Sequence, residues 1–274
     1  MREVKEVVKK FTPEEIKEYL DRIGMSPVEE PTKEALDEII YRQQCSLPFE
    51  NLDSFDLHKE VCLDPDYVFQ KIIQGKRGGY CLELNGLLYR LLISLGYDAR
   101  LCFVRVLLGS DDFTTWADHR AIIVTLDGAE YFCDGGLGGP MPAGALKIDT
   151  DEWQTYKKES FRVLPSIKGW YEVHRKTRIS QQVGREDAAE RIEILFSDVA
   201  CFSSDFAFLN YFQSTCKDAR FCMLRVINIR TEDGYRTLIN DEYKEVSEDN
   251  VIIEPVGGRL KEVLKEKFDI EIEL

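Results

Sequence analysis

The chain has 274 residues, 44% of them hydrophobic, and a formal net charge of −14 at pH 7. This length allows two or three closely packed lobes, and the acidic balance argues against nucleic acid or an anionic membrane as a general partner. No stretch approaches the ~20 apolar residues that span a bilayer, and the charged N-terminus lacks the apolar segment of a secretory signal.

The first 96 residues carry the pattern of four helices. Thr12, Pro13 and Glu15 form a capping box with proline at the first helical position, and Gly24 ends this helix. The next three helices have threonine, proline or glycine at their ends. Their predicted ranges are 32–45, 65–75 and 81–95.

From residue 98 onward the pattern changes to short runs of β-branched and aromatic residues, separated by Gly, Pro or Asp. Such runs predict a small barrel or sandwich. The predicted strands are 100–108, 120–126, 130–134, 161–164, 170–173 and 179–183.

After about residue 190 the sequence carries both strand and helix patterns. The runs 219–230 and 235–240 predict a hairpin around Asp233-Gly234. The spacing of apolar residues between 260 and 268 predicts one face of a final helix.

Eight cysteines are spread along the chain without a Cys-x-x-Cys pair. A structural zinc site or a thioredoxin-like motif is therefore not expected. Most of these cysteines stand in apolar runs, as Cys102 and Cys222 do, which is typical of buried free thiols. We expect a cytoplasmic protein without disulfide bonds and without a bound metal.

The most informative stretch is 77–85, which reads Arg-Gly-Gly-Tyr-Cys-Leu-Glu-Leu-Asn. Two glycines followed by a helix pattern place Cys81 in the first helical turn, where the dipole and free backbone N–H groups stabilise an anion. Lowering a thiol pKa from about 8.5 to about 5 takes roughly 5 kcal/mol, and the dipole supplies only about 1 kcal/mol. A reactive Cys81 therefore needs a cationic partner, and a buried structural cysteine is the alternative.

Three histidines are available as that partner. His58 and His174 stand among charged residues, and we expect both to be solvated or locally bonded. His119 opens the apolar run 120–124, at the mouth of a predicted strand. A strand-end histidine bonded to water is the alternative for His119.

The predicted turn at Asp127-Gly128 would bring His119 close to the carboxylate of Asp134. A two-residue hairpin turn pairs Asp134 with Ala121, so Asp134 and His119 are diagonal neighbours on one face. Such neighbours are about 7–8 Å apart, within reach of an imidazole–carboxylate hydrogen bond, whereas a three-residue turn can separate them onto opposite faces. With the two-residue turn, Asp134 orients His119 and His119 activates Cys81, as in a Ser-His-Asp triad with sulfur as nucleophile.

The stretch 77–85 resembles the signature of arylamine N-acetyltransferases, and Pro-Phe-Glu-Asn-Leu at 48–52 matches an upstream motif of that family. His119 before an apolar strand and Asp134 before a glycine-rich loop match its two other catalytic positions, in the same order. Fainter matches at 204–206 and 268–270 extend the resemblance over essentially the whole chain. Four motifs in one order are far more specific than any one of them.

The resemblance implies an α+β fold with a cysteine-protease-like core. Its expected parts are an N-terminal helical bundle bearing the cysteine (1–96), a central β-barrel bearing histidine and aspartate (97–188) and a C-terminal α/β lid (189–274). It also implies an enzyme with ping-pong chemistry and no metal: acetyl-CoA, the co-substrate, acylates Cys81, and an arylamine, arylhydrazine or N-hydroxyarylamine then takes the acetyl group. The backbone N–H of Cys81 is a candidate oxyanion donor.

The family pattern also suggests supporting residues. Glu50 and Arg77 are expected to form an ion pair behind the site, with Asn85 as further support. Two separate surface charges are the alternative to that pair. The residues expected to bind substrate are Phe49, Leu137 and Phe206, and those expected to contact coenzyme A are Gly135, Gly136 and Gly138.

Two departures from the family pattern concern the acceptor. The family usually reads Asp-Val-Gly-Phe-Gly after the strand, whereas residues 134–138 here are Asp-Gly-Gly-Leu-Gly. Leu137 thus replaces an aromatic ring, and an acceptor that stacks on that ring would lose about 0.5–1.5 kcal/mol. Gln43 and Gln44 stand where many relatives have a histidine.

Three alternatives share parts of this pattern. A papain-like or transglutaminase-like thiol hydrolase has the same Cys-His-Asp order, although the residues around Cys81 do not match the papain motif. An amide synthase that closes a macrolactam resembles the same family. A binding protein that has kept the fold is disfavoured, since all three catalytic positions are occupied. The sequence assigns no oligomeric state.

Overall fold

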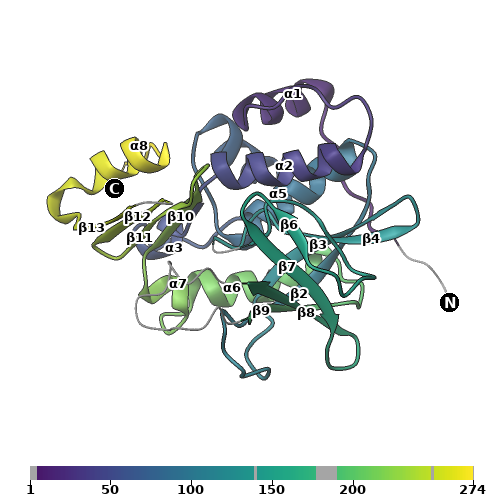
Figure 1. The fold of residues 1–274 in the computed structure, drawn as a ribbon. Coiled ribbons are helices and arrows are strands. Elements are labelled where there is room, and N and C mark those ends of the chain that lie inside the picture. The colour runs from purple at the N-terminus through teal and green to yellow at the C-terminus, as the bar shows by residue number, and fades with distance from the viewer. Residues whose placement is uncertain (1–4, 139–140, 177–189, 248–249, 274) are drawn as a thin grey trace.

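The structure is a computed structural model that describes residues 5–138, 141–176, 190–247 and 250–273. Figure 1 shows the first helices at the top, a curved sheet of short strands beneath them and a smaller sheet with the last helix at the left. The predicted α+β fold of helical bundle, barrel and α/β lid is confirmed. The predicted strand 179–183 lies outside the described residues.

The helical part is built around α5 (Cys81–Ser94), in which 11 of 14 residues are buried. The predicted capping box is present, since the side chains of Thr12 and Glu15 each accept a hydrogen bond from the other's backbone N–H, at 3.2 and 2.7 Å. Gly96, with φ of +95°, makes the left-handed turn out of α5. The other elements are α1 (Pro13–Arg22), α2 (Lys33–Ser46), α3 (Leu52–Phe55), α4 (Pro65–Phe69) and the π-helix η1 (Gln70–Gln74).

Eight antiparallel strands form the barrel, in the order β5-β4-β3-β2-β9-β8-β7-β6. Its two edge strands are joined by one side chain, because Gln154 accepts from the N–H of Lys147 at 2.8 Å and donates to its carbonyl at 2.9 Å. The sheet includes residues 190–197, beyond the predicted barrel end at 188. The strands are β2 (Asp98–Val106), β3 (His119–Leu126), β4 (Ala129–Cys133), β5 (Leu146–Lys147), β6 (Gln154–Tyr156), β7 (Glu159–Pro165), β8 (Trp170–Lys176) and β9 (Glu190–Ser197).

Strand β3 separates two hydrophobic cores, which explains its unbroken apolar sequence. Ile122 and Val124 pack with the helices, while Ala121 and Ile123 pack inside the barrel. By the same alternation, His119 lies on the barrel side of β3 and Arg120 on the helix side. Two neighbouring residues therefore approach α5 from different faces of one strand.

A second, five-stranded sheet has the order β1-β10-β11-β12-β13. Its first strand comes from the N-terminal part, since Phe49 and Glu50 pair with Asn228 and Ile227. The elements are β1 (Phe49–Glu50), η3 (Ser203–Phe206), α6 (Ala207–Thr215), α7 (Arg220–Met223), β10 (Val226–Arg230), β11 (Tyr235–Ile239), β12 (Glu242–Val246), β13 (Val251–Pro255), η4 (Gly257–Arg259) and α8 (Leu260–Phe268).

The predicted hairpin before residue 240 is partly wrong. Strands β10 and β11 pair as expected, but residues 220–223 form the helix α7 instead of the start of a strand. The side chain of Asn51 donates to the carbonyls of Phe221 and Leu224, at 2.8 and 2.7 Å. The side chain of Asn51, distant in the sequence, thus provides hydrogen-bond partners for carbonyls that the local sequence predicts to pair in a sheet.

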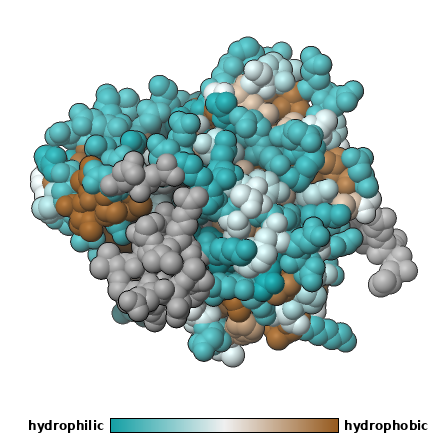
Figure 2. Space-filling model, in the orientation of Figure 1, coloured by the Kyte–Doolittle hydropathy of each residue, from teal (hydrophilic) through white to brown (hydrophobic). Residues whose placement is uncertain are grey.

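The surface in Figure 2 is mostly hydrophilic, with separate apolar patches. Strand β13 contributes exposed side chains from Val251, Ile252 and Ile253 at the edge of the second sheet. Within the four described ranges, no helix is long and apolar enough to cross a membrane. All eight cysteines are free.

Candidate active site

Cys81 is the first residue of α5 and is 3% exposed. Glu83 caps this helix by accepting a hydrogen bond of 3.0 Å from the N–H of Tyr80. The preceding glycines lie against the segment 48–50, because Glu50 N–H donates to the carbonyl of Gly79 at 3.0 Å. A Cβ atom on Gly78 would overlap the carbonyl oxygen of Pro48. The two sequence motifs 48–52 and 77–85 are therefore one hydrogen-bonded unit that positions Cys81.

The hairpin of β3 and β4 brings His119 and Asp134 together. Asp127 and Gly128 have φ values of +51° and +77°, and Leu126 pairs with Ala129, as in the two-residue turn that the sequence predicts. The Nε2 atom of His119 lies 2.7 Å from Oδ2 of Asp134. The other ring nitrogen, Nδ1, is left for the thiol of Cys81, which contributes to the raised pKa of His119.

Asn85 organises this acid–histidine pair from the next turn of α5. Its Nδ2 donates to Oδ1 of Asp134 at 2.9 Å and to the carbonyl of Arg120 at 2.6 Å. Its Oδ1 accepts from the N–H of Gly135 at 2.9 Å. Because Gly136 N–H also donates to Oδ1 of Asp134, at 2.8 Å, both carboxylate oxygens are held in place.

The electrostatic surroundings favour a charged His119. Burial opposes the charge on the imidazole, but Asp134 and the hydrogen bond with Cys81 outweigh it and raise the pKa of His119 to about 10. At neutral pH the ring is an imidazolium beside the sulfur. The imidazolium is therefore the cationic partner that a reactive Cys81 needs, because the helix dipole alone supplies only about 1 kcal/mol.

The raised pKa of His119 predicts a pH-dependent contribution to stability. Because the folded pKa of about 10 lies above the ordinary 6.5, the contribution is complete below pH 6.5 and is lost as pH rises toward about 10. We expect the gap in unfolding free energy between wild type and His119→Gln to shrink by a few kcal/mol over this range. Urea unfolding at several pH values measures it, and a pH-independent gap would contradict the linkage.

A cluster of five buried charges lies behind Cys81. The predicted Glu50–Arg77 ion pair is present at 2.7 Å, and Arg77 also pairs with Asp53 at 2.9 Å. Lys71 bridges Asp53 and Glu83, at 2.6 and 2.8 Å. Burial raises the pKa of Glu83 to about 7 against the opposing pull of Lys71. The capping carboxylate of α5 therefore depends on Lys71 for its charge.

Two glutamines on α2 hold the loop after β4. The Nε2 of Gln43 lies 3.2 Å from the carbonyl of Gly135, and that of Gln44 lies 2.8 Å from the carbonyl of Asp134. The sequence alone predicts no such role for either residue. Gln43 continues the buried stripe of Leu36, Ile39 and Ile40, and a fully buried polar group in such a stripe is a signal that it needs partners.

A narrow hollow lies beside this loop, between α2, α5 and strand β10. Phe49, Leu137, Gly138 and Arg230 are among the residues that line it. Gly138 has φ of +68°, and a Cβ atom there would overlap the ring of Phe49. Phe206 lies elsewhere: it is fully buried with its ring 4.6 Å from that of Phe103, and it does not line the hollow.

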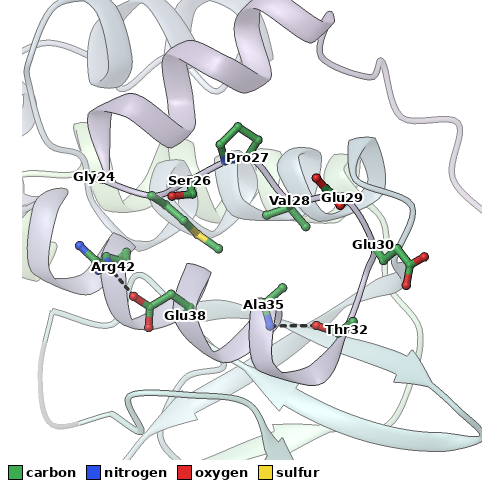
Figure 3. Close-up of a pocket in the computed structure, with 11 residues that line it drawn as sticks. Gly24, Ser26, Pro27, Val28, Glu29, Glu30, Thr32, Ala35, Glu38 and Arg42 are labelled. Atoms are coloured by element: carbon green, nitrogen blue, oxygen red, sulfur yellow. Dashed lines mark hydrogen bonds and ion pairs between the residues drawn. The ribbon is translucent and has the colours of Figure 1, made fainter.

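A second hollow lies between the segment 24–32 and α2 (Figure 3). Its charged side chains include Glu38 and Arg42, whose carboxylate and guanidinium are 2.6 Å apart. None of the predicted site residues lines it. No cluster of three or more potential metal-binding side chains occurs among the residues that the structure describes.

The chain is similar in sequence and structure to known enzymes. The family model described as N-acetyltransferase matches residues 32–274. The chain is 28% identical to the pineal gland isozyme of arylamine N-acetyltransferase from Gallus gallus, over 94% of each chain. It is 32% identical to the arylamine N-acetyltransferase / N-hydroxyarylamine O-acetyltransferase of Salmonella typhimurium over 152 residues, which span 56% of this chain and 54% of that relative.

Two solved structures show the same fold. The arylamine N-acetyltransferase from Salmonella typhimurium superimposes with a TM-score of 0.86 at 23% identity, covering 96% of this chain and 94% of that one. The enzyme from Mycobacterium marinum, solved in complex with CoA, gives a TM-score of 0.83 at 24% identity, with 93% and 92% covered.

Proposed function

Because this chain belongs to the arylamine N-acetyltransferase family, we propose that it moves an acetyl group from acetyl-CoA to an aromatic amine through a thioester on Cys81. The observation that carries the proposal is the buried chain of Cys81, His119 and Asp134 at the start of α5. The names of the relatives support the acceptor class, and the CoA complex of a structural neighbour supports the donor.

In the first half-reaction, the Cys81 thiolate attacks the carbonyl carbon of acetyl-CoA. A carbon–sulfur bond to Cys81 forms, the bond to the coenzyme A sulfur breaks, and His119 gives its proton to the departing sulfur. The backbone N–H of Cys81 has no partner within the helix and is the candidate donor to the oxyanion. The result is an acetylated Cys81, a neutral His119 and free coenzyme A.

In the second half-reaction, the amine nitrogen attacks the thioester carbonyl and His119 accepts its proton. The bond to the Cys81 sulfur breaks, and the thiolate returns beside a charged His119. Asp134 keeps the ring in one orientation through both steps, since its Oδ2 lies 2.7 Å from Nε2 of His119.

The hollow beside the glycine loop is the proposed acceptor pocket. Phe49 and Leu137 supply its apolar wall, as the family pattern suggests. The N–H groups of Gly135 and Gly136 are already bonded within the site. Of the three glycines predicted to contact coenzyme A, Gly138 is therefore the one best placed to do so.

Leu137→Phe is expected to improve the use of aromatic acceptors. A ring at this half-buried position adds stacking worth about 0.5–1.5 kcal/mol, equivalent to a rise of about 2- to 10-fold in kcat/KM. Steady-state kinetics with an arylamine measures the rise. A hydrazine without a ring is the control, and an equal gain for it would rule out stacking as the cause.

Intact-mass measurement after incubation with acetyl-CoA tests the proposed function. Wild type is expected to gain one acetyl group, which the arylamine then removes, and Cys81→Ala is expected to gain none. Absence of an adduct from acetyl-, propionyl- and malonyl-CoA would refute the transferase proposal. Turnover of a peptide amide instead would favour the thiol hydrolase alternative.

A further inference from the structure

Helix α6 is buried on its polar face and exposed on its aromatic face. The buried residues are Asn210, Gln213 and Ser214. On the other face, Phe208 and Tyr211 are 82% and 57% exposed. An ordinary surface helix has the opposite arrangement, with apolar side chains against the core. Because buried amides need hydrogen-bond partners, the contacts of the polar face show what α6 holds in place.

Asn210 binds the residue that precedes Cys81. Its Oδ1 accepts a hydrogen bond from the hydroxyl of Tyr80, and its Nδ2 donates to the carbonyl of Val61 at 2.8 Å. Tyr80 is 1% exposed and is the N-cap residue of α5. The first turn of α5, which begins at Cys81, is therefore attached to α6 through the side chain of Tyr80.

Gln213 binds the residue that precedes His119. Its Nε2 donates to the carbonyl of Asp118 at 2.9 Å. Asp118 lies just outside the ladder of β2 and β3, whose last pair is Val104 with His119, so the ladder supplies no partner for this carbonyl. The Oε1 of Gln213 has no hydrogen-bond partner among the described residues. The bond to Asp118 is therefore the contribution of this side-chain amide.

The two amides act from one helix on two separate elements. Asn210 and Gln213 are three residues apart, so their side chains lie on the same face of α6. Cys81 is the first residue of α5, and His119 is the first residue of β3. A helix that binds the residue before each of them holds the start of α5 and the start of β3 at a fixed separation. Figure 1 shows α6 on the side of the molecule opposite α1 and α2.

We propose that α6 is a brace that sets the distance between Cys81 and His119, with Asn210 and Gln213 as positioning residues. The proposal rests on the proposed roles of Cys81 and His119 in acyl transfer. The charge on His119 stabilises a Cys81 thiolate only while the ring stays beside the sulfur, and a misplacement of about 1 Å can lower a rate by about 100-fold. Through this brace, a helix of the C-terminal part controls the reactivity of an N-terminal cysteine.

Alkylation of Cys81 by iodoacetamide across pH tests Gln213 without any acyl transfer. The adduct is quantified on the peptide that contains Cys81, because other thiols also react. Gln213→Met changes no charged group and also removes the unpartnered Oε1, so its cost in stability should be small. The pH profile is expected to move upward by about one unit, which lowers the rate about tenfold below the midpoint. A wild-type profile in this variant would overturn the proposal.

Gln154→Met is the matched control for Gln213→Met. Gln154 also binds backbone groups, the N–H and the carbonyl of Lys147, but it contacts neither Tyr80 nor Asp118. This variant loses two hydrogen bonds and should lower the unfolding free energy, measured with urea, by more than Gln213→Met does. Its alkylation profile should nevertheless stay that of wild type. An equal shift in both variants would show that loss of stability is the cause, and the proposal would be wrong.

Tyr80→Phe tests the other contact of the brace. It keeps the aromatic ring and removes the hydroxyl that binds Asn210, so the alkylation profile should again move upward. Tyr243→Phe removes a hydroxyl that donates to Glu245 at 2.6 Å in the second sheet and should leave the profile unchanged. A shift in only one of Gln213→Met and Tyr80→Phe would mean that α6 does not hold both elements. If the profiles are as expected but wild type gains no acetyl group, only the proposed function is refuted.

Discussion

Asp134→Asn is expected to lower kcat by about 10⁴-fold while the fold stays intact. The reason lies in the other contacts of this carboxylate. Its Oδ1 accepts hydrogen bonds from Asn85 and Gly136, so the carbonyl oxygen of the new asparagine must take that place. Its NH₂ group then faces Nε2 of His119, which has to become an acceptor. The ring proton moves to Nδ1, where it faces Cys81, and a neutral ring in that tautomer cannot take a proton from the thiol.

Steady-state kinetics with acetyl-CoA and an arylamine measures this loss. Circular dichroism and urea unfolding check that the fold is unchanged. The matched control is Asp112→Asn, which removes a carboxylate from an exposed turn and should leave kcat unchanged. A loss below about tenfold in Asp134→Asn would mean that Asp134 does not set the tautomer of His119.

Lys71→Met is expected to cost about 3–5 kcal/mol of unfolding free energy. Lys71 is the cation that contacts both Asp53 and Glu83, and its loss leaves buried carboxylates undercompensated. Glu83 also caps α5 by accepting from the N–H of Tyr80. The helix that carries Cys81 would therefore lose stability at its first turn.

Urea unfolding measures the effect of Lys71→Met. The double variant Lys71→Met with Glu83→Gln should recover part of the loss, because it removes one of the unpaired charges. Lys17→Met is the matched control: Lys17 pairs with Asp21 on the exposed side of α1, where such a pair contributes less than about 1 kcal/mol. If Lys17→Met and Lys71→Met lowered the unfolding free energy by similar amounts, burial of the ion pairs would not be the reason for the effect of Lys71→Met.

The parts of the site that the sequence predicted were specified locally. The turn at Asp127-Gly128 needs two residues with positive φ, and this requirement sets the register that joins His119 to Asp134. The two glycines before Cys81 likewise mark the start of α5. Local signals of this kind predicted α1, α2, the stretch of α4 and η1, and α5, together with most of the barrel strands, whereas the short helix α3 was not predicted.

The missed features depend on contacts between distant segments. In the sequence, Lys71 cannot be distinguished from an exposed lysine on a helix. Its buried ion pairs with Asp53 and Glu83 form only when the three segments pack together. Phe206 matches a family motif but is buried against Phe103, where η3 meets β2. Strands β12 and β13 were missed because few of their side chains are buried, so the alternation of apolar and polar residues is weak.

The pairing of β1 with β10 has a consequence for how the protein matures during synthesis. Phe49 and Glu50 leave the ribosome long before Asn228 and Ile227, their partners in the sheet. Until those partners emerge, the strand that supports Gly79 has one side without hydrogen bonds. Cys81, the proposed nucleophile, is therefore translated early, but its support is complete only late. A nascent chain that stops short of β10 should carry a Cys81 that is not yet held in its final position.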